Sequence, residues 1–222
     1  MTHLYLIRHA ESQEETQKVI GDLPLTSYGM QQIDLLSRRF SETREIQPDV
    51  LFSSPLQRAK ETAEKLAPVW GVSVVVESGL AKWMPPQAEG LHFDAFKRAY
   101  GSNPFRANPS FPVNETWAQY LVRVYSTFDR LLSVHNGKTI IVITHRGVIE
   151  CAYSYLQGIA TLQFPPVHYE CDYTAICYWR KIPDAFSSGW SLVKHNDATH
   201  LQHSYDGDFP GKEEKNSNAC KR

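Results

Sequence analysis

Residues 4–12 read LYLIRHAES, and this stretch decides the fold. Its run of apolar residues, bounded by polar ones, predicts a short strand that is buried on both faces. The strand ends at Arg8 and His9. Ligands of open α/β sheets bind beyond the carboxyl ends of the strands, so Arg8 and His9 are candidates for a binding site. The alternative is a strand that ends in two polar surface residues.

Two later stretches repeat this arrangement. Residues 49–54 (DVLFSS) predict a second strand, and Arg58 follows in the first turn of the next helix. Residues 138–144 (KTIIVIT) predict a third strand, which is followed by His145 and Arg146. Charged residues are rarely buried unless they are paired, so packing alone does not explain this recurrence. We therefore expect these side chains to converge at one edge of a sheet.

The rest of the chain alternates between helical and strand patterns. After the first strand, helices are predicted over 26–40, 55–69, 116–134 and 147–156, and further strands over 72–76, 169–180 and 190–194. Such alternation predicts an α/β fold with a mostly parallel, doubly wound sheet and helices on both faces. The expected architecture is a three-layer α/β/α sandwich, with the last two strands at an edge.

Residues 78–112 interrupt this alternation. The segment is rich in proline and contains scattered aromatic residues, including Trp83, Phe93, Phe96 and Phe105. Loops of this length inside a domain are usually functional, so we interpret it as an inserted cap or lid over the site. We expect one domain over 1–203 and a disordered, charged tail over 204–222.

Composition excludes several classes of partner. A net charge of −1 argues against nucleic acid and anionic membranes, and no apolar run has the length of a membrane span. The first strand begins so early that it leaves no room for a signal peptide. Cys151, Cys171, Cys177 and Cys220 form no CxxC pair, so we expect free thiols and a cytoplasmic location.

Four motifs, and a closing segment, resemble the histidine phosphatase superfamily, in the smaller phosphatase branch of its phosphoglycerate-mutase-like group. They match in family order over nearly the whole chain. The motifs are LIRHAES (6–12), LTxxG (25–29), SSPLxRAxxTA (53–63) and THxGVI (144–149), and the closing segment is NDxxHL (196–201).

The resemblance implies a phosphomonoesterase that acts on a small phosphate ester, with no metal and no cofactor, as a monomer or homodimer. A neutral imidazole is a good nucleophile near neutral pH, so His9 is the expected carrier of a phosphohistidine. Arg8, Arg58 and a protonated His145 would neutralise the phosphoryl oxygens. Relatives contact their substrate at the positions of Ser12 and Gly21.

Three positions depart from the family pattern. Glu15 replaces an asparagine, and Lys82 stands where the proton donor of relatives follows a Leu-x-Glu pattern. Glu89 aligns with a glutamate further along, so we predict Glu89 as the acid and keep Lys82 as the alternative donor. Arg146 replaces a small residue; it either binds a second anionic group of the substrate or points into solvent.

Two other functions compete with a phosphatase. A phosphoglycerate mutase is less expected, because family mutases are generally longer and keep the acid. A non-catalytic phosphate-binding module fits Glu15 and Lys82, but binding alone needs no imidazole nucleophile. His195, His200 and His203 cluster in sequence without the spacing of a zinc site, so no metal site is expected there.

Overall fold

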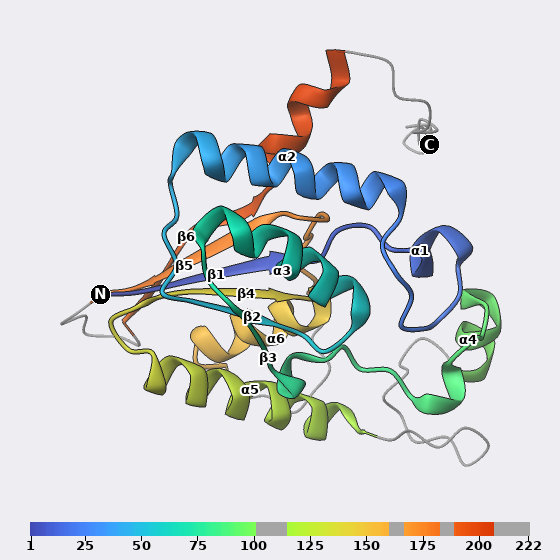
Figure 1. The fold of residues 1–222 in the computed structure, drawn as a ribbon. Coiled ribbons are helices and arrows are strands. Elements are labelled where there is room, and N and C mark those ends of the chain that lie inside the picture. The colour runs from blue at the N-terminus through green and yellow to red at the C-terminus, as the bar shows by residue number, and fades with distance from the viewer. Residues whose placement is uncertain (101–114, 160–166, 183–188, 207–222) are drawn as a thin grey trace, which may run out of the picture.

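A sheet of six strands lies at the centre of the part of the chain that the structure describes. The structure is a computed structural model and describes residues 1–100, 115–159, 167–182 and 189–206. The strand order is β3-β2-β4-β1-β5-β6 (Figure 1). The strands are β1 (Thr2–Arg8), β2 (Val50–Ser53), β3 (Val74–Val76), β4 (Thr139–Thr144), β5 (Ile176–Lys181) and β6 (Trp190–Asp197).

The first four strands in the chain run parallel, and the last two run antiparallel to their neighbours. This confirms the mostly parallel sheet. Of the two late strands, β6 forms the expected edge, whereas β5 lies between β1 and β6. β5 begins later than predicted, at Ile176, because a turn precedes it. Thr174 has a left-handed φ of 57°, and Ala175 N–H donates to Asp172 O over 3.2 Å. The predicted strand over 169–175 was therefore wrong.

Helices cover both faces of the sheet (Figure 1). Buried residues of α2 and α3 pack on one face with Ile7 and Ile143, and buried residues of α5 and α6 pack on the other with Leu6 and Val142. Neighbouring residues of β1 and β4 thus point to opposite faces, as pleating requires. The predicted three-layer sandwich is confirmed. The helices are α1 (Gln13–Gln17), α2 (Ser27–Thr43), α3 (Gln57–Trp70), α4 (Phe93–Tyr100), α5 (Trp117–Val134) and α6 (Arg146–Leu156).

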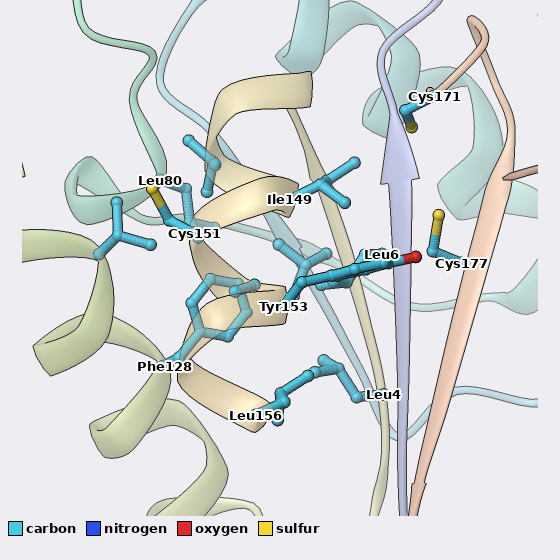
Figure 2. Packing of buried hydrophobic residues seen from close by; sticks show 14 of the residues in the cluster. Leu4, Leu6, Leu80, Phe128, Ile149, Cys151, Tyr153, Leu156, Cys171 and Cys177 are labelled. Carbon is cyan, nitrogen blue, oxygen red and sulfur yellow. The ribbon is translucent and has the colours of Figure 1, made fainter. Parts of the chain in front are cut away.

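The α5–α6 face holds the larger of the two apolar clusters. Figure 2 shows Tyr153 and Leu156 of α6 reaching toward Leu4 and Leu6 of β1, with Phe128 of α5 beside them. Burying one such side chain contributes about 1.5–3 kcal/mol. This packing holds α6 against the sheet, so the first turn of α6 has a defined place at the sheet's edge.

Helix ends follow local signals. Thr26 accepts a hydrogen bond from the Gly29 amide and caps α2. Thr116 caps α5, with Gln119 completing a capping box. The helix after β2 begins at Gln57, so Pro55 lies before its first turn and the predicted start was early. Gly71 ends that helix in a left-handed conformation, φ 66°.

The described part of the expected lid, residues 78–100, forms three short pieces. Two are single turns, η1 (Ser78–Leu80) and η2 (Pro86–Ala88), and the third is α4. Leu80 and Trp83 are buried in the larger cluster, and backbone hydrogen bonds tie Leu91 and Phe93 to residues 18–20. Residues 101–112 lie outside the described residues, and the lid role stays a prediction.

Three remaining sequence predictions concern cysteines, membranes and the tail. Cys151, Cys171 and Cys177 are free and buried (Figure 2), while Cys220 lies outside the described residues. No helix in the described ranges has both the length and the apolar character needed to cross a bilayer. Residues 207–222 of the predicted tail are outside the described part, and residues 199–206 form a short helix, η3 (Thr199–Asp206).

Candidate active site

Two adjacent parallel strands bring two histidines together. Arg8 pairs with Thr144 in the β1–β4 register, so His9 and His145 each follow a paired residue. The His9 amide donates to the Thr144 carbonyl over 2.9 Å. The two imidazole rings lie 4.9 Å apart between centroids, in an edge-on arrangement. Residues far apart in sequence thus form one site at the carboxyl edge of the sheet.

His9 is held as a neutral imidazole with a free nitrogen. Its Nδ1 lies 2.7 Å from the Ala10 carbonyl, which can only accept, so Nδ1 carries the proton. Nε2 therefore keeps its lone pair and accepts from Arg58 Nε at 3.3 Å. Burial, followed by the charges of Arg58 and Arg8, holds the pKa of His9 well below its usual value.

Arg58 lies behind His9 in the first turn of α3 and is fully buried. Its guanidinium donates to the Gly21 carbonyl over 3.1 Å and pairs with Glu14 at 3.2 Å. Asp22 lies 3.7 Å away. Gly21, Glu14 and Asp22 thus compensate the charge at the end of the guanidinium, and the Nε atom is directed at His9.

His145 is buried beside His9 and contacts Ser54. Its Nε2 lies 2.8 Å from Ser54 Oγ, and its Nδ1 has no hydrogen-bond partner among the described residues. Burial, followed by the nearby His9 and Arg58, holds the pKa of His145 well below its usual value. A bound phosphate would raise this pKa, and the protonated donor expected from the sequence belongs to that bound state.

Arg8 is fixed by contacts that the sequence did not indicate. One of its nitrogens donates to the Cys171 carbonyl over 2.6 Å, and its guanidinium lies 3.8 Å from the centre of the Tyr173 ring. Stacking of this kind orients the planar cation. Glu15 lies 3.9 Å from the same guanidinium. Tyr173 sits in a turn before β5, where no local motif would mark it.

A pocket of about 390 Å³ opens in front of the histidines. It collects five of the predicted site residues, namely Arg8, His9, Lys82, His145 and Arg146. The other lining residues are Glu14, Glu15, Trp83, Trp117, Tyr120, Gly147, Glu150 and His168. The lining is therefore mixed, with charged groups near His9 and three aromatic rings.

The other predicted residues do not line this pocket. Ser12 is buried, and its hydroxyl donates to Glu15 over 2.8 Å. Gly21 contributes its carbonyl to Arg58 and does not line the pocket. Glu89 is exposed at the end of η2 and is not among the lining residues. The structure does not bring Glu89 to the site.

A carboxylate that sequence analysis missed lies in the pocket instead. Glu14 is almost completely buried, with 1% of its surface exposed. Lys82 Nζ lies 2.6 Å from one of its oxygens and 2.7 Å from the other. A signal for this pair existed, because Lys82 brings a positive charge to a position where relatives carry an acid, and a buried lysine needs an opposite charge.

The closing segment braces the site from behind. His200 Nε2 lies 2.8 Å from Thr174 Oγ, and the Thr174 amide donates to the Arg8 carbonyl over 3.0 Å. His195 contacts the Tyr153 hydroxyl at 2.9 Å. Among the described residues, no group of three or more His, Cys, Asp or Glu side chains has the arrangement of a metal site.

Comparisons with known proteins identify the family of this sequence. A sequence model of the histidine phosphatase superfamily (branch 1) matches residues 4–198. The chain is 29% identical over 178 residues to a Hydrogenobacter thermophilus protein named "Putative phosphoserine phosphatase 2", covering 76% of this chain and 85% of that protein. It is 23% identical over 210 residues to "Probable phosphoglycerate mutase GpmB" of Klebsiella pneumoniae, covering 90% and 95%.

A solved structure supports the fold. A mutant of phosphoserine phosphatase from Entamoeba histolytica, in complex with phosphoserine, matches with a TM-score of 0.70 at 22% identity. The match covers 90% of this chain and 100% of that one. The α/β fold that the sequence predicts is thus shared with the Entamoeba histolytica phosphatase.

Proposed function

Because this chain belongs to the histidine phosphatase superfamily (branch 1), we propose that it is a phosphomonoesterase that forms a phosphohistidine on His9. The observation that carries the proposal is the state of His9. Its proton is held on Nδ1 by the Ala10 carbonyl, and its unprotonated Nε2 accepts a hydrogen bond from Arg58 Nε. A neutral nucleophile next to a cation suits attack on a phosphate dianion.

In the first step, His9 Nε2 forms a bond to phosphorus and the bond to the ester oxygen breaks. Arg8, which lines the pocket, would donate to the phosphoryl oxygens, and Arg58 would do so once its Nε–H turns from His9 Nε2 to the phosphate. His145 becomes a third donor once it is protonated in the field of the phosphate. Such preorganised donors are worth about 3 kcal/mol each in the transition state.

In the second step, water attacks phosphorus and the bond to Nε2 breaks, which returns His9 to its neutral form. No metal is required, because protein side chains compensate the charge of the phosphate. The substrate is a small phosphate ester, which the pocket of about 390 Å³ can hold. The name of the Entamoeba structure, a complex with phosphoserine, supports this class of ligand.

The nucleophile is tested by trapping. Enzyme quenched in alkaline detergent after mixing with an aryl phosphate radiolabelled in its phosphoryl group should retain a base-stable, acid-labile phosphate, and His9→Ala should retain none. The measurement is made with excess chelator present, and inorganic phosphate should still be released. Unchanged turnover by His9→Ala would overturn the mechanism. Phosphoryl transfer to a second hydroxyl without release of phosphate would indicate a mutase, and no turnover would indicate a binding module.

A further inference from the structure

Lys82 is a half-buried amine in the pocket that contains both histidines. It occupies the position where the resemblance leads one to expect a proton donor. Glu89, the acid predicted from the sequence, is exposed and outside the pocket. The proposed reaction therefore needs a donor from within the pocket.

The backbone on both sides of Lys82 is fixed. Arg123 of α5 donates to the Gly79 carbonyl over 2.8 Å and to the Ala81 carbonyl over 3.1 Å. Thr144, at the end of β4, donates to the Leu80 carbonyl over 2.9 Å. These contacts tie the turn to the same strand that presents His145. Lys82 thus has a defined position relative to the reacting groups.

The ammonium of Lys82 is oriented by Glu14. Nζ lies 2.6 Å and 2.7 Å from the two carboxylate oxygens, and Arg58 lies 3.2 Å from one of them. An ammonium has three donor positions, so contact with one carboxylate leaves a proton for another acceptor. His9, Arg58, Glu14 and Lys82 form one continuous chain of contacts from the nucleophile to the amine.

The carboxylates of the pocket are poorly suited to donate a proton. Glu14 contacts two cations, Arg58 and Lys82, and both of its oxygens accept from Lys82. Glu15 accepts a hydrogen bond from Ser12 and lies near Arg8. Glu150 accepts from the Tyr169 amide over 3.2 Å and lies 3.5 Å from His168 Nδ1. Lys82 is therefore the group best placed to act as the acid.

We propose that Lys82 is the general acid of this enzyme and that Glu14 is its positioning residue. The inference rests on the proposed phosphatase reaction and names the residue that serves its leaving group. Relatives place a carboxylic acid at this position, whereas this chain places an ammonium there and a compensating carboxylate on α1.

The proton transfers balance over the two steps. As His9 Nε2 bonds to phosphorus and the ester bond breaks, the Lys82 ammonium gives one proton to the leaving oxygen and becomes an amine. As water attacks the phosphohistidine, the Lys82 amine takes one proton from that water. Inorganic phosphate leaves, and both side chains return to their starting states.

The surroundings suit this cycle. Burial lowers the pKa of Lys82 from its usual value; Glu14 and Glu15 oppose the shift, and Arg58 adds to it. A donor is most efficient when its pKa is near the working pH. Charged and titratable groups face Lys82 from every side among the described residues. They are Arg8 and His9 at the end of β1, Glu14 and Glu15 of α1, Arg58 of α3, Tyr120 and Arg123 of α5 with Glu115 before it, His145, Arg146 and Glu150 of α6, and His168.

The test compares two leaving groups. An alkoxide needs a proton in order to leave, whereas 4-nitrophenolate does not. General acid catalysis contributes roughly 10²–10⁴-fold, so Lys82→Met and Lys82→Arg should lose at least about 100-fold in single-turnover rate on ethyl phosphate. On 4-nitrophenyl phosphate the loss should stay below about tenfold. Lys65→Met, at an exposed lysine of α3, serves as the matched control.

Lys82→Arg separates acid catalysis from charge alone. Arginine keeps the positive charge but does not release its proton near neutral pH. If Lys82→Arg keeps the ethyl phosphate rate, or if both variants lose equally on both substrates, Lys82 only binds phosphate and the proposal is wrong. If the wild type turns over neither substrate, the proposed function itself fails.

Glu14 is tested through the pH profile. The ethyl phosphate rate requires protonated Lys82, so it falls as pH rises through the pKa of that amine. Since the charge of Glu14 raises this pKa, Glu14→Gln should move the alkaline limb to lower pH, and Glu14→Asp should restore it. If Glu14 is only structural, Glu14→Gln will lower the rate at every pH without shifting the alkaline limb of the pH profile. That result would overturn its positioning role.

Discussion

At the scale of the residue, Arg146 stands apart from the other cations of the pocket. Arg8, Arg58 and Lys82 are each held by an oxygen or a carboxylate. Arg146 is exposed, and no hydrogen bond or ion pair joins it to any residue that the structure describes. Its position at the start of α6, directly after His145, places its charge close to the reacting phosphate. It is thus the cation most available to a second anionic group of a substrate.

We predict that Arg146→Ala raises KM about tenfold or more for a phosphate ester that carries a second anionic group, for which phosphoserine is the test compound, because a charge-assisted hydrogen bond contributes about 1.5–3 kcal/mol. The value of kcat should change little, since Arg146 acts on a part of the substrate that does not react. Arg146→Lys, which keeps the charge, is the matched control. Steady-state kinetics on phosphoserine and on ethyl phosphate make the comparison. An equal KM increase on ethyl phosphate would show that Arg146 does not select a second anion.

At the scale of the element, α2 lies close to the loop that follows β1. Gly29, in the first turn of α2, faces the backbone of Glu11, and a Cβ added there would lie 2.2 Å from the Glu11 carbonyl oxygen. The Thr26 amide donates to the same carbonyl over 3.0 Å. The glycine of the LTxxG motif therefore lets the helix approach the segment that presents His9.

We predict that Gly29→Ala lowers the free energy of unfolding by about 2–3 kcal/mol, because the obstacle is backbone and cannot move aside. Gly71→Ala is the comparison. A Cβ there meets nothing within 4 Å, so the cost comes from the left-handed φ of 66° alone, about 1 kcal/mol. Urea unfolding of both variants checks the order. A smaller loss for Gly29→Ala than for Gly71→Ala would contradict the close approach.

At the scale of the whole molecule, an ion-pair network joins the last strand to the first long helix. Arg39 of α2 lies 2.7 Å from Asp197 of β6 and 2.5 Å from Glu45. Lys194 contacts the same two carboxylates. The hydrogen bond from Arg39 is the largest cause that holds the pKa of Asp197 well below its usual value. Ion pairs thus hold the start of the closing segment against α2.

We predict that Asp197→Asn lowers the free energy of unfolding by about 1–3 kcal/mol at pH 7, since it removes a hydrogen-bonded charge. Because the pKa of Asp197 is depressed in the folded state, its contribution is present above about pH 4 and lost as pH falls further. The difference between variant and wild type should therefore shrink below pH 4. Urea unfolding at several pH values measures it, with the exposed Asp94 mutated to asparagine as control.

The sequence by itself determined the elements and the core of the site. Apolar runs with defined ends specify β1, β2 and β4, and parallel strands must bring their carboxyl ends to one edge. His9 and His145 directly follow two of those strands, and Arg58 opens the helix after the third, so their convergence follows from topology. Local signals of this kind can be identified in the sequence without knowing which distant residues are in contact.

Tertiary structure alone decided which charges meet. Glu14 and Lys82 are 68 positions apart, and their pairing depends on how η1 is clamped between α5 and β4. Glu89 aligned with an acid by motif, yet η2 leaves it exposed. The lowered pKa of His145 likewise depends on burial and on the groups around it. Desolvation and Coulomb energies depend on distances through space, which the order of residues along the chain does not contain.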